Sequence, residues 1–270
     1  MHDQSFSVLI SVFLRDNHLL FDLALKSIFR NSIQPNEVVL IVDGPITKEI
    51  ESIISKYANE WPKLLKVYRL KNNMGLFFAL NYGIKKINSY WVVRADSDDI
   101  NHRNRFENLM RFSSQGYDVI GSGINEVDNE GNFLRKKSSP EKHKEICAFA
   151  LRRNPINHMS VMFKKNIFME VGGYPDLYFR EDYGLWVKLI AHGAIFYNIQ
   201  MELVDANIAN GFLNRRGGIR YAFAEIKLQS LMSDLGLKSR FSAFFDGSLR
   251  TFVFLLPSFL RGKIYMHLLR

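Results

Sequence analysis

In the first hundred residues, short β-branched runs alternate with segments of helical periodicity, and this alternation restricts the chain to α/β folds. Successive runs begin about 25 to 30 residues apart, which is the length of a strand, a crossover helix and their loops. Apolar residues between them recur on one helix face, from Ile50 to Trp61 and from Leu76 to Ile87. We therefore expect a mostly parallel central sheet flanked by helices. Its strands are expected at residues 7–13, 37–43, 65–70 and 91–95.

The pattern becomes less regular after Asp99. Apolar periodicity and turn residues predict, in chain order, a helix over 104–112, a strand over 117–121, a hairpin turn over 128–132, a strand over 158–163, a helix over 182–192 and a strand over 194–198.

The chain becomes helical from Gly217 onward. Residues 249–270 combine many aromatic and aliphatic side chains with Arg250, Arg261, Lys263 and Arg270. This composition is typical of an interfacial helix or helix pair, here broken near Pro257. A terminal helix that docks on the core would show the same pattern, so the sequence leaves both interpretations open.

Composition restricts the class of protein and the compartment in which it would work. With 270 residues, of which 47% are hydrophobic, the chain can bury a full core. A single cysteine, Cys147, cannot form an internal disulfide, and the first residues do not resemble a secretory signal. No window approaches 18 consecutive apolar residues. We expect a protein of a reducing, cytoplasmic compartment.

The formal net charge of +9 would suit nucleic acid, anionic lipid or a phosphorylated ligand. The basic residues are spread along the chain and no nucleic-acid recognition motif accompanies them. We therefore expect no nucleic-acid partner, and the other two partners remain open.

Acidic residues follow two of the predicted strands. Asp43 ends the second strand, and Asp96, Asp98 and Asp99 follow the fourth. Ligands of open α/β sheets bind at the carboxyl ends of the strands, and residues two apart on an extended segment can share one hard cation. The chain has no GxGxxG or GxxxxGK[ST] sequence to bind phosphates, so a divalent ion is the simplest way to offset the negative charge of a bound diphosphate.

These acids also have purely structural interpretations. An Asp-rich turn can cap a helix, and Asp43 can be a turn residue before Gly44. Further along, Glu181 and Asp182 lie at a loop-to-helix junction, where one carboxylate could act as general base or simply cap the helix. His158 could orient a phosphate or the acceptor, or be a core histidine.

Together these motifs resemble the family 2 glycosyltransferases, specifically bacterial enzymes that assemble O-antigen, capsule or exopolysaccharide. The resemblance runs from Ser7 to about Asn198 and is carried by Asp43, by NMGLFFALNYGI (73–84), by RADSDD (94–99) and by GGYPD followed by EDYGLW. It implies a GT-A fold that binds a nucleotide-diphospho-sugar. The implied division is a GT-A domain over 1–215, with a nucleotide-binding half (1–100) and an acceptor-binding half (101–215), followed by a helical, membrane-associating segment over 216–270.

The resemblance also implies roles for single residues. Asp43 would contact the donor base, often uracil, with Asn73, Arg94 and His158 as further donor-site residues. Asp96 and Asp98 would hold the ribose and a metal, Mn²⁺ or Mg²⁺, with Asp99 beside them. Asp182 would deprotonate the acceptor hydroxyl, supported by Glu181. A basic segment at 215–218 would lie near the donor phosphates.

The expected reaction is an inverting transfer of one sugar, because the QxxRW sequence of processive synthases is missing. The expected acceptor is a polyprenyl-diphosphate-linked saccharide at the cytoplasmic face of the inner membrane, where the basic helical segment would bind the anionic surface. Two alternatives remain. The first is a sugar nucleotidyltransferase, which would need a Gly-rich phosphate loop soon after the first strand, but residues 14–18 at that place contain no glycine. The second is a noncatalytic membrane-bound binding module, which would carry the same acids without using them.

Overall fold

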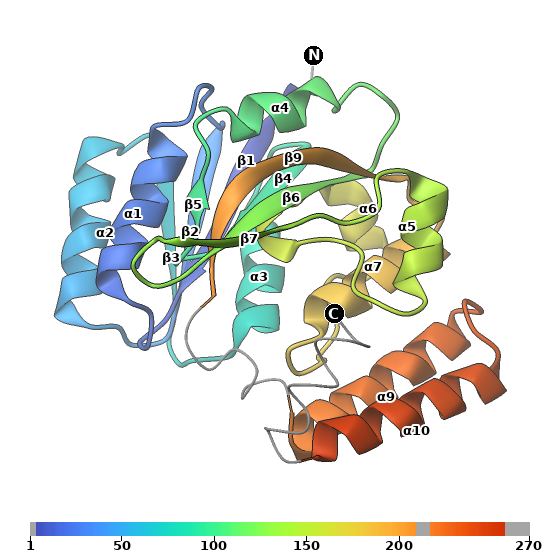
Figure 1. The fold of residues 1–270 in the computed structure, drawn as a ribbon. Coiled ribbons are helices and arrows are strands. Elements are labelled where there is room, and N and C mark those ends of the chain that lie inside the picture. Colours follow the sequence, from blue (N-terminus) through green and yellow to red (C-terminus); the bar gives the residue numbers. More distant parts are fainter. Residues whose placement is uncertain (1–3, 209–216, 257–270) are drawn as a thin grey trace.

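The computed structural model describes residues 4–208 and 217–256. One twisted sheet forms the centre, with helices on both of its faces (Figure 1). The strand order is β3-β2-β1-β4-β8-β6-β9-β5, and β7 pairs with β6 outside this path. The expected α/β architecture is confirmed.

The first half of the sheet is parallel throughout. It consists of β1 (Phe6–Val12), β2 (Glu37–Asp43), β3 (Leu65–Leu70) and β4 (Trp91–Ala95). The predicted bounds of β2, β3 and β4 are confirmed, and β1 begins and ends one residue earlier than predicted. Strands covered on both faces are apolar throughout, which is why these runs were readable in the sequence.

Two hydrophobic cores lie on opposite faces of the sheet. On one face β1 and β2 pack against α1 (His18–Phe29), α2 (Lys48–Glu60) and α4 (Arg105–Arg111). The other face packs against α3 (Leu76–Ile84), α5 (His143–Ala150), α6 (Lys165–Glu170) and α7 (Glu181–Ala191). Alternate residues of β1 supply the two cores, with Val8 and Ile10 in one and Leu9 in the other.

The second half of the sheet is mixed and corrects several predicted bounds. It contains β5 (Ile100–Asn101), β6 (Val119–Val127), β7 (Phe133–Lys137), β8 (Met162–Lys164) and β9 (Phe196–Asn207). The hairpin turn at 128–132 is confirmed between β6 and β7. The strands predicted at 117–121 and 194–198 extend much further than expected, because β6 and β9 pair with each other along their length.

The strand predicted over 158–163 is wrong in its first half. Residues His158–Ser160 form a 3₁₀ turn, and β8 starts only at Met162. The Ser160 hydroxyl donates to the carbonyls of Ser122 and Asn157, at 3.1 and 3.0 Å. Such side-chain bonds to the backbone compete with a strand ladder, and an apolar pattern does not reveal them.

After β9, α9 (Ile219–Asp234) and α10 (Arg240–Leu255) form an antiparallel hairpin at one end of the molecule (Figure 1). Leu228 and Met232 of α9 pack on Tyr183 and Val187 of α7. The helical prediction is thus confirmed for residues 219–255, and α10 ends just before Pro257. The predicted segment at 257–270 lies outside the described residues. Among the helices of 4–208 and 217–256, none has the length and apolar character needed to cross a bilayer.

Candidate active site

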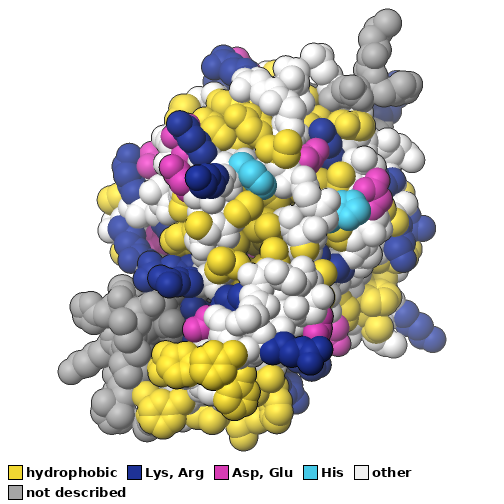
Figure 2. All heavy atoms as spheres, turned by 90° about the vertical axis from the view of Figure 1, so that its right-hand side faces the viewer, with side chains coloured by type: hydrophobic (Ala, Val, Ile, Leu, Met, Phe, Trp, Pro, Cys, Tyr) yellow, Lys and Arg dark blue, Asp and Glu magenta, His cyan; other side chains and the backbone are white. Residues whose placement is uncertain are grey.

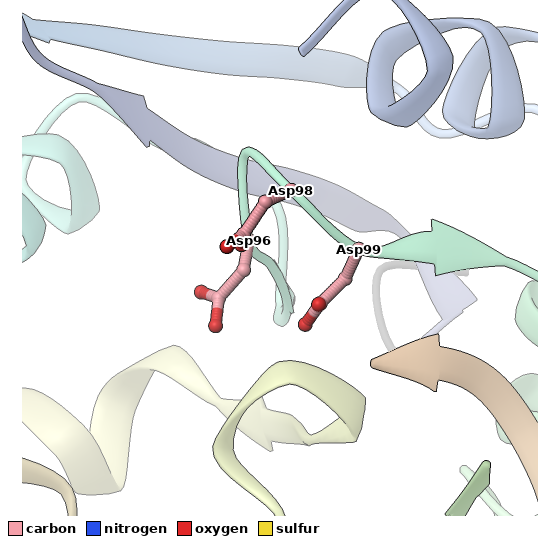
Figure 3. A group of neighbouring side chains, drawn as sticks. All are labelled: Asp96, Asp98 and Asp99. Atoms are coloured by element: carbon pink, nitrogen blue, oxygen red, sulfur yellow. The ribbon is translucent and has the colours of Figure 1, made fainter. Parts of the chain in front are cut away.

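An acidic loop connects β4 to β5 at the carboxyl edge of the parallel strands. Asp96, Asp98 and Asp99 each place a carboxylate oxygen within 4.8 Å of the others (Figure 3). The loop is held at both ends, because Ala95 pairs with Ile10 of β1 and Ile100 pairs with Asp205 of β9. Sheet pairing on both sides therefore brings the three side chains together, as their spacing predicted.

Asp99 is the buried member of this group, with 3% of its surface exposed. Its Oδ1 accepts a hydrogen bond of 2.8 Å from the Asn207 backbone, and within the described chain its buried Oδ2 has no hydrogen-bond partner. Burial, with repulsion from Asp96 and Asp98, raises the pKa of Asp99 well above its usual value. Three clustered carboxylates with an unpaired buried oxygen fit a hard divalent cation.

Two buried arginines lie behind the acidic loop. Arg94 is the next-to-last residue of β4, and its guanidinium lies 2.5 Å from Oδ1 of Asp96 and donates to the Leu9 carbonyl. Arg105 of α4 donates to the Arg94 carbonyl at 2.8 Å, and burial lowers its pKa to about 9. Arg94 and Arg105 hold the loop from its buried side, while Asp96 and Asp98 remain partly exposed.

Asp43 lies at the same sheet edge, one strand away beyond β1. Its carboxylate accepts hydrogen bonds from the backbone N–H groups of Met74 and Gly75, at 2.7 and 2.9 Å, and its carbonyl accepts one from the Asn73 side chain. Gly44 follows with φ 87°, and a Cβ there would lie 2.5 Å from the Asn73 nitrogen. Asp43 therefore shapes the loop before α3, which includes the predicted donor-site residue Asn73.

Asp182 lies in the first turn of α7, where the positive end of the helix dipole favours a carboxylate. Its Oδ2 accepts a hydrogen bond of 2.6 Å from Asn154, and its Oδ1 accepts one of 2.7 Å from the Tyr183 backbone. The side chain is half-buried. Asp182 is thus oriented by two donors while part of its surface stays accessible to a ligand.

Glu181, the neighbour of Asp182, has a strongly raised pKa. Burial and repulsion from Asp182 raise the pKa of Glu181 to about 8, and Asp96 adds further repulsion. At neutral pH Glu181 is therefore protonated, which suits a hydrogen-bond donor better than a base. The acidic loop and the start of α7 therefore lie close enough for their charges to interact.

His158 lies near Arg94, Asp96 and Asp182. Its Nε2 is 2.9 Å from the Tyr174 hydroxyl, and its ring packs edge-on against Trp186 of α7. Burial and the nearby Arg94 lower its pKa, so the imidazole is neutral at pH 7. Asn81 of α3 bonds both the N–H and the carbonyl of Tyr174, at 2.9 Å each. These hydrogen bonds join the motif at 73–84 to the GGYPD motif.

The sequence matches the family described as glycosyl transferase family 2 over residues 7–172. A curated relative, UDP-Gal:alpha-D-GlcNAc-diphosphoundecaprenol beta-1,3-galactosyltransferase of Escherichia coli, is 39% identical over 98% of this chain and 96% of its own length. The chain belongs to glycosyl transferase family 2.

A second family 2 relative is the amylovoran biosynthesis glycosyltransferase AmsE of Erwinia amylovora, 31% identical over 93% of this chain and 94% of its own. Among solved structures, S. aureus TarS 1–349 in complex with UDP-GlcNAc aligns with a TM-score of 0.71 at 18% identity, covering 97% of this chain and 75% of that one. The predicted resemblance and the GT-A type of fold are confirmed, and the chain is a glycosyltransferase of the type found in bacterial polysaccharide biosynthesis.

Three residues of this family 2 site were missed at the sequence level. Asn154 orients Asp182, and Tyr174, which appeared only within the GGYPD motif, orients His158. Asp16, in the loop after β1, accepts a 2.8 Å hydrogen bond from Ser97 of the acidic loop, and burial raises its pKa to about 6. No spacing in the sequence links 16 to 97. The predicted basic pair at 215–216 lies outside the described residues.

Proposed function

We propose that this family 2 enzyme transfers one sugar from a nucleotide-diphospho-sugar to a polyprenyl-diphosphate-linked saccharide, with inversion at the anomeric carbon. The observation that carries the proposal is a pair of acidic sites from distant parts of the chain that lie close enough for their charges to interact. One is a cation-suited cluster at the end of β4, and the other is the oriented Asp182 at the start of α7.

On the donor side, Asp96, Asp98 and Asp99 would hold a Mn²⁺ or Mg²⁺ ion. When bound, the ion would offset the charge of the donor diphosphate and stabilise it as a leaving group. Arg94 keeps Asp96 in place, and the loop tied down by Asp43 and Asn73 would border the nucleotide base. His158, neutral and hydrogen-bonded to Tyr174, would contact the transferred sugar or a phosphate.

On the acceptor side, Asp182 would act as general base. The acceptor hydroxyl gives its proton to the Asp182 carboxylate while its oxygen forms a bond to the anomeric carbon. The bond from that carbon to the diphosphate oxygen breaks, and the nucleoside diphosphate leaves. A single displacement of this kind inverts the configuration. Asn154 would keep the carboxylate aimed at the hydroxyl, and the protonated Glu181 would donate a hydrogen bond.

The names of the relatives support a proposal for both substrates. The E. coli relative is named for a UDP-galactose donor and a GlcNAc-diphosphoundecaprenol acceptor, and TarS was solved with UDP-GlcNAc. We propose a UDP-sugar donor, a hexose or N-acetylhexosamine, and a lipid-linked saccharide of surface polysaccharide synthesis as acceptor.

The α9–α10 hairpin supports a peripheral position at the cytoplasmic face of the inner membrane. Its outer side exposes large apolar side chains, and Figure 2 shows them as a patch at one end of the molecule with Lys and Arg side chains at its edge. Exposed aromatic residues with flanking cations suit an anionic bilayer surface. The most exposed members are Ile219, Phe223, Phe241, Phe244, Phe245 and Phe252.

This hairpin gives the chain a three-part organisation in the proposal. Residues 1–100 would form the nucleotide-binding half, residues 101–215 the acceptor-binding half, and residues 216–270 the membrane-associating segment. Flotation with anionic liposomes tests the last part. Phe241→Ser with Phe244→Ser should shift the protein from the lipid fraction to the soluble fraction, whereas equal partitioning of variant and wild type would refute membrane binding by this face.

A transfer assay tests the function itself. Purified protein is given UDP-sugars and a synthetic GlcNAc-diphosphate lipid, with Mn²⁺ or with EDTA. We expect one added sugar per acceptor in Mn²⁺ and none in EDTA. Formation of a nucleotide sugar from a sugar phosphate and a nucleoside triphosphate would instead indicate a nucleotidyltransferase, and donor binding without transfer or hydrolysis would indicate a noncatalytic module.

A further inference from the structure

A cavity of about 460 Å³ lies beside Asp182, on the side away from the acidic loop. Its walls come from β7, the turn after α5, the start of α7 and the α9–α10 hairpin. Asp182 lines it, whereas Asp96, Asp98 and Asp99 do not. We call it the cationic cavity, and a ligand in it would reach the proposed base without entering the metal site.

The lining of the cationic cavity is strongly basic. Among the described residues, seven lysines and arginines line it against a single carboxylate, that of Asp182. Five of the cations come from two adjoining segments, namely Arg135, Lys136, Lys137, Arg152 and Arg153. Arg135 also pairs with Glu126 and Lys136 with Glu202, at 2.6 and 3.0 Å, so part of this charge is balanced by acids outside the lining. Guanidinium groups match phosphate oxygens in geometry and charge.

The remaining two cations, Arg180 and Arg250, show that this wall is built rather than accidental. Both pair with the fully buried Glu225 of α9, at 2.6 and 3.7 Å. The Arg180 guanidinium lies over the Tyr221 ring at 4.6 Å, and Arg250 donates to the Arg152 backbone carbonyl at 2.5 Å. The hairpin therefore anchors the segment that carries Arg152.

We propose that the cationic cavity binds the diphosphate of the lipid-linked acceptor. This inference rests on the proposed function. In such an acceptor the diphosphate is attached to the sugar that accepts, so one sugar ring separates it from the attacking hydroxyl. Asp182, the proposed base, lies in the wall of the same cavity, so a diphosphate bound there would bring the attached sugar to it. Phe254 and Tyr221, on the hairpin side of the cavity, lead from there toward the apolar outer face of α9 and α10.

The donor also carries a diphosphate, so the two sources must be distinguished. The donor's phosphates are assigned to the cation held by the acidic loop, none of whose aspartates lines this cavity. A diphosphate in the cationic cavity is therefore the acceptor's. The enzyme would use a metal for one diphosphate and lysines and arginines for the other.

The test uses two acceptors that carry the same saccharide, one as the diphosphate lipid and one as an alkyl glycoside without phosphate. The variant is Lys137→Gln with Arg152→Gln, and the control is Lys63→Gln with Arg30→Gln, a matched pair of exposed cations on the far face. We expect kcat/KM for the diphosphate acceptor, relative to the glycoside, to fall about 10- to 100-fold in the variant, because charge-assisted hydrogen bonds are lost. The control should keep the wild-type ratio.

Other results would overturn the proposal. An unchanged ratio, or an equal fall for both acceptors, would mean that the cavity does not recognise the acceptor diphosphate. A raised KM for the UDP-sugar with an unchanged acceptor ratio would assign the cavity to the donor. Circular dichroism melts show whether the double variant is folded, and Lys137→Gln alone replaces it if it is not.

A binding experiment separates this inference from the proposed function. Pyrophosphate is titrated into the full chain in metal-free buffer. If wild type transfers sugar, loss of pyrophosphate binding in the variant supports the inference and equal binding refutes it. If wild type transfers no sugar to either acceptor, the proposed function fails, and the titration alone still decides whether the cavity binds a diphosphate.

Discussion

The proposed donor side, around the acidic loop, and the proposed acceptor side, around the cationic cavity, are built in opposite ways. The donor side consists of strand ends and one loop, its groups are carboxylates, and its order comes from sheet pairing on both sides of the acidic loop. The acceptor side consists of β7, the turn after α5 and parts of α7, α9 and α10, and its charged groups are mainly cations. Under the two proposals, one fold would provide two phosphate sites, one with a metal and one without.

The largest effect is expected at the point where the two sides meet. Asp182→Asn should lower kcat about 100- to 10,000-fold, because the attacking hydroxyl loses its proton acceptor. The affinity for the UDP-sugar in Mn²⁺ should stay within a few-fold of wild type, since the donor site is untouched. Steady-state kinetics and calorimetry measure the two quantities. Asp176→Asn, an exposed acid in the preceding loop, serves as the control.

The acceptor side should depend on one buried ion-pair group for its stability. Glu225→Gln leaves Arg180 and Arg250 without their buried partner, which costs about 3–5 kcal/mol. That loss lowers the melting temperature by on the order of 10 °C. The matched change on the donor side, Glu51→Gln, removes an exposed pair with Arg69 and should cost at most about 1 kcal/mol. Equal losses in the two variants would remove the contrast between the sides.

Removal of a donor-side carboxylate should act through the metal. Asp98→Asn should weaken Mn²⁺-dependent binding of UDP by at least the roughly 10- to 100-fold that loss of a supporting group costs at metal sites. Pyrophosphate binding in metal-free buffer should be unaffected. Titrations of UDP with and without Mn²⁺ give the comparison, with Asp22→Asn as a surface control. Metal-independent UDP binding in wild type would refute the cation site.

The smallest effect concerns Glu181 and is seen in the pH dependence of stability. Its pKa of about 8 in the folded chain lies above the ordinary value of 4.5, so the folded state holds a proton that the unfolded state releases. Wild-type stability should therefore decline between these two pH values. Glu181→Gln lacks this decline, and its melting temperature relative to wild type should rise by a few degrees from about pH 5 to pH 8. A constant difference would show that Glu181 titrates normally.

The donor side was largely predictable from the sequence. Strands β2 and β4 are buried almost throughout, so their apolar runs end where the strands end, whereas the edge strand β3 is mostly half-buried. The residues Asp96, Asp98 and Asp99 lie together because they are neighbours in one short loop. Local pattern was sufficient there, because the contacts that make the cluster are local or follow from parallel pairing.

The acceptor side was predictable only in its motifs. Asp182 and His158 were identified, but Asn154, Tyr174 and Asn81, which orient them, act over separations that no periodicity encodes. The cationic cavity combines β7 with α10, more than a hundred residues apart. The 3₁₀ turn at His158–Ser160 depends on a serine hydroxyl and was read as strand. The sequence pattern does not reveal contacts between side chains that lie far apart in the chain.

The configuration of the newly formed linkage tests the central claim most directly. Wild type is incubated with an α-linked UDP-sugar, Mn²⁺ and the diphosphate-lipid acceptor, and the anomeric proton coupling of the product is read by NMR. Attack by a hydroxyl activated by Asp182, on a donor held by the acidic loop, predicts a β-linked product only. An α-linked product would contradict the account, because it requires a different order of bond making at these same carboxylates.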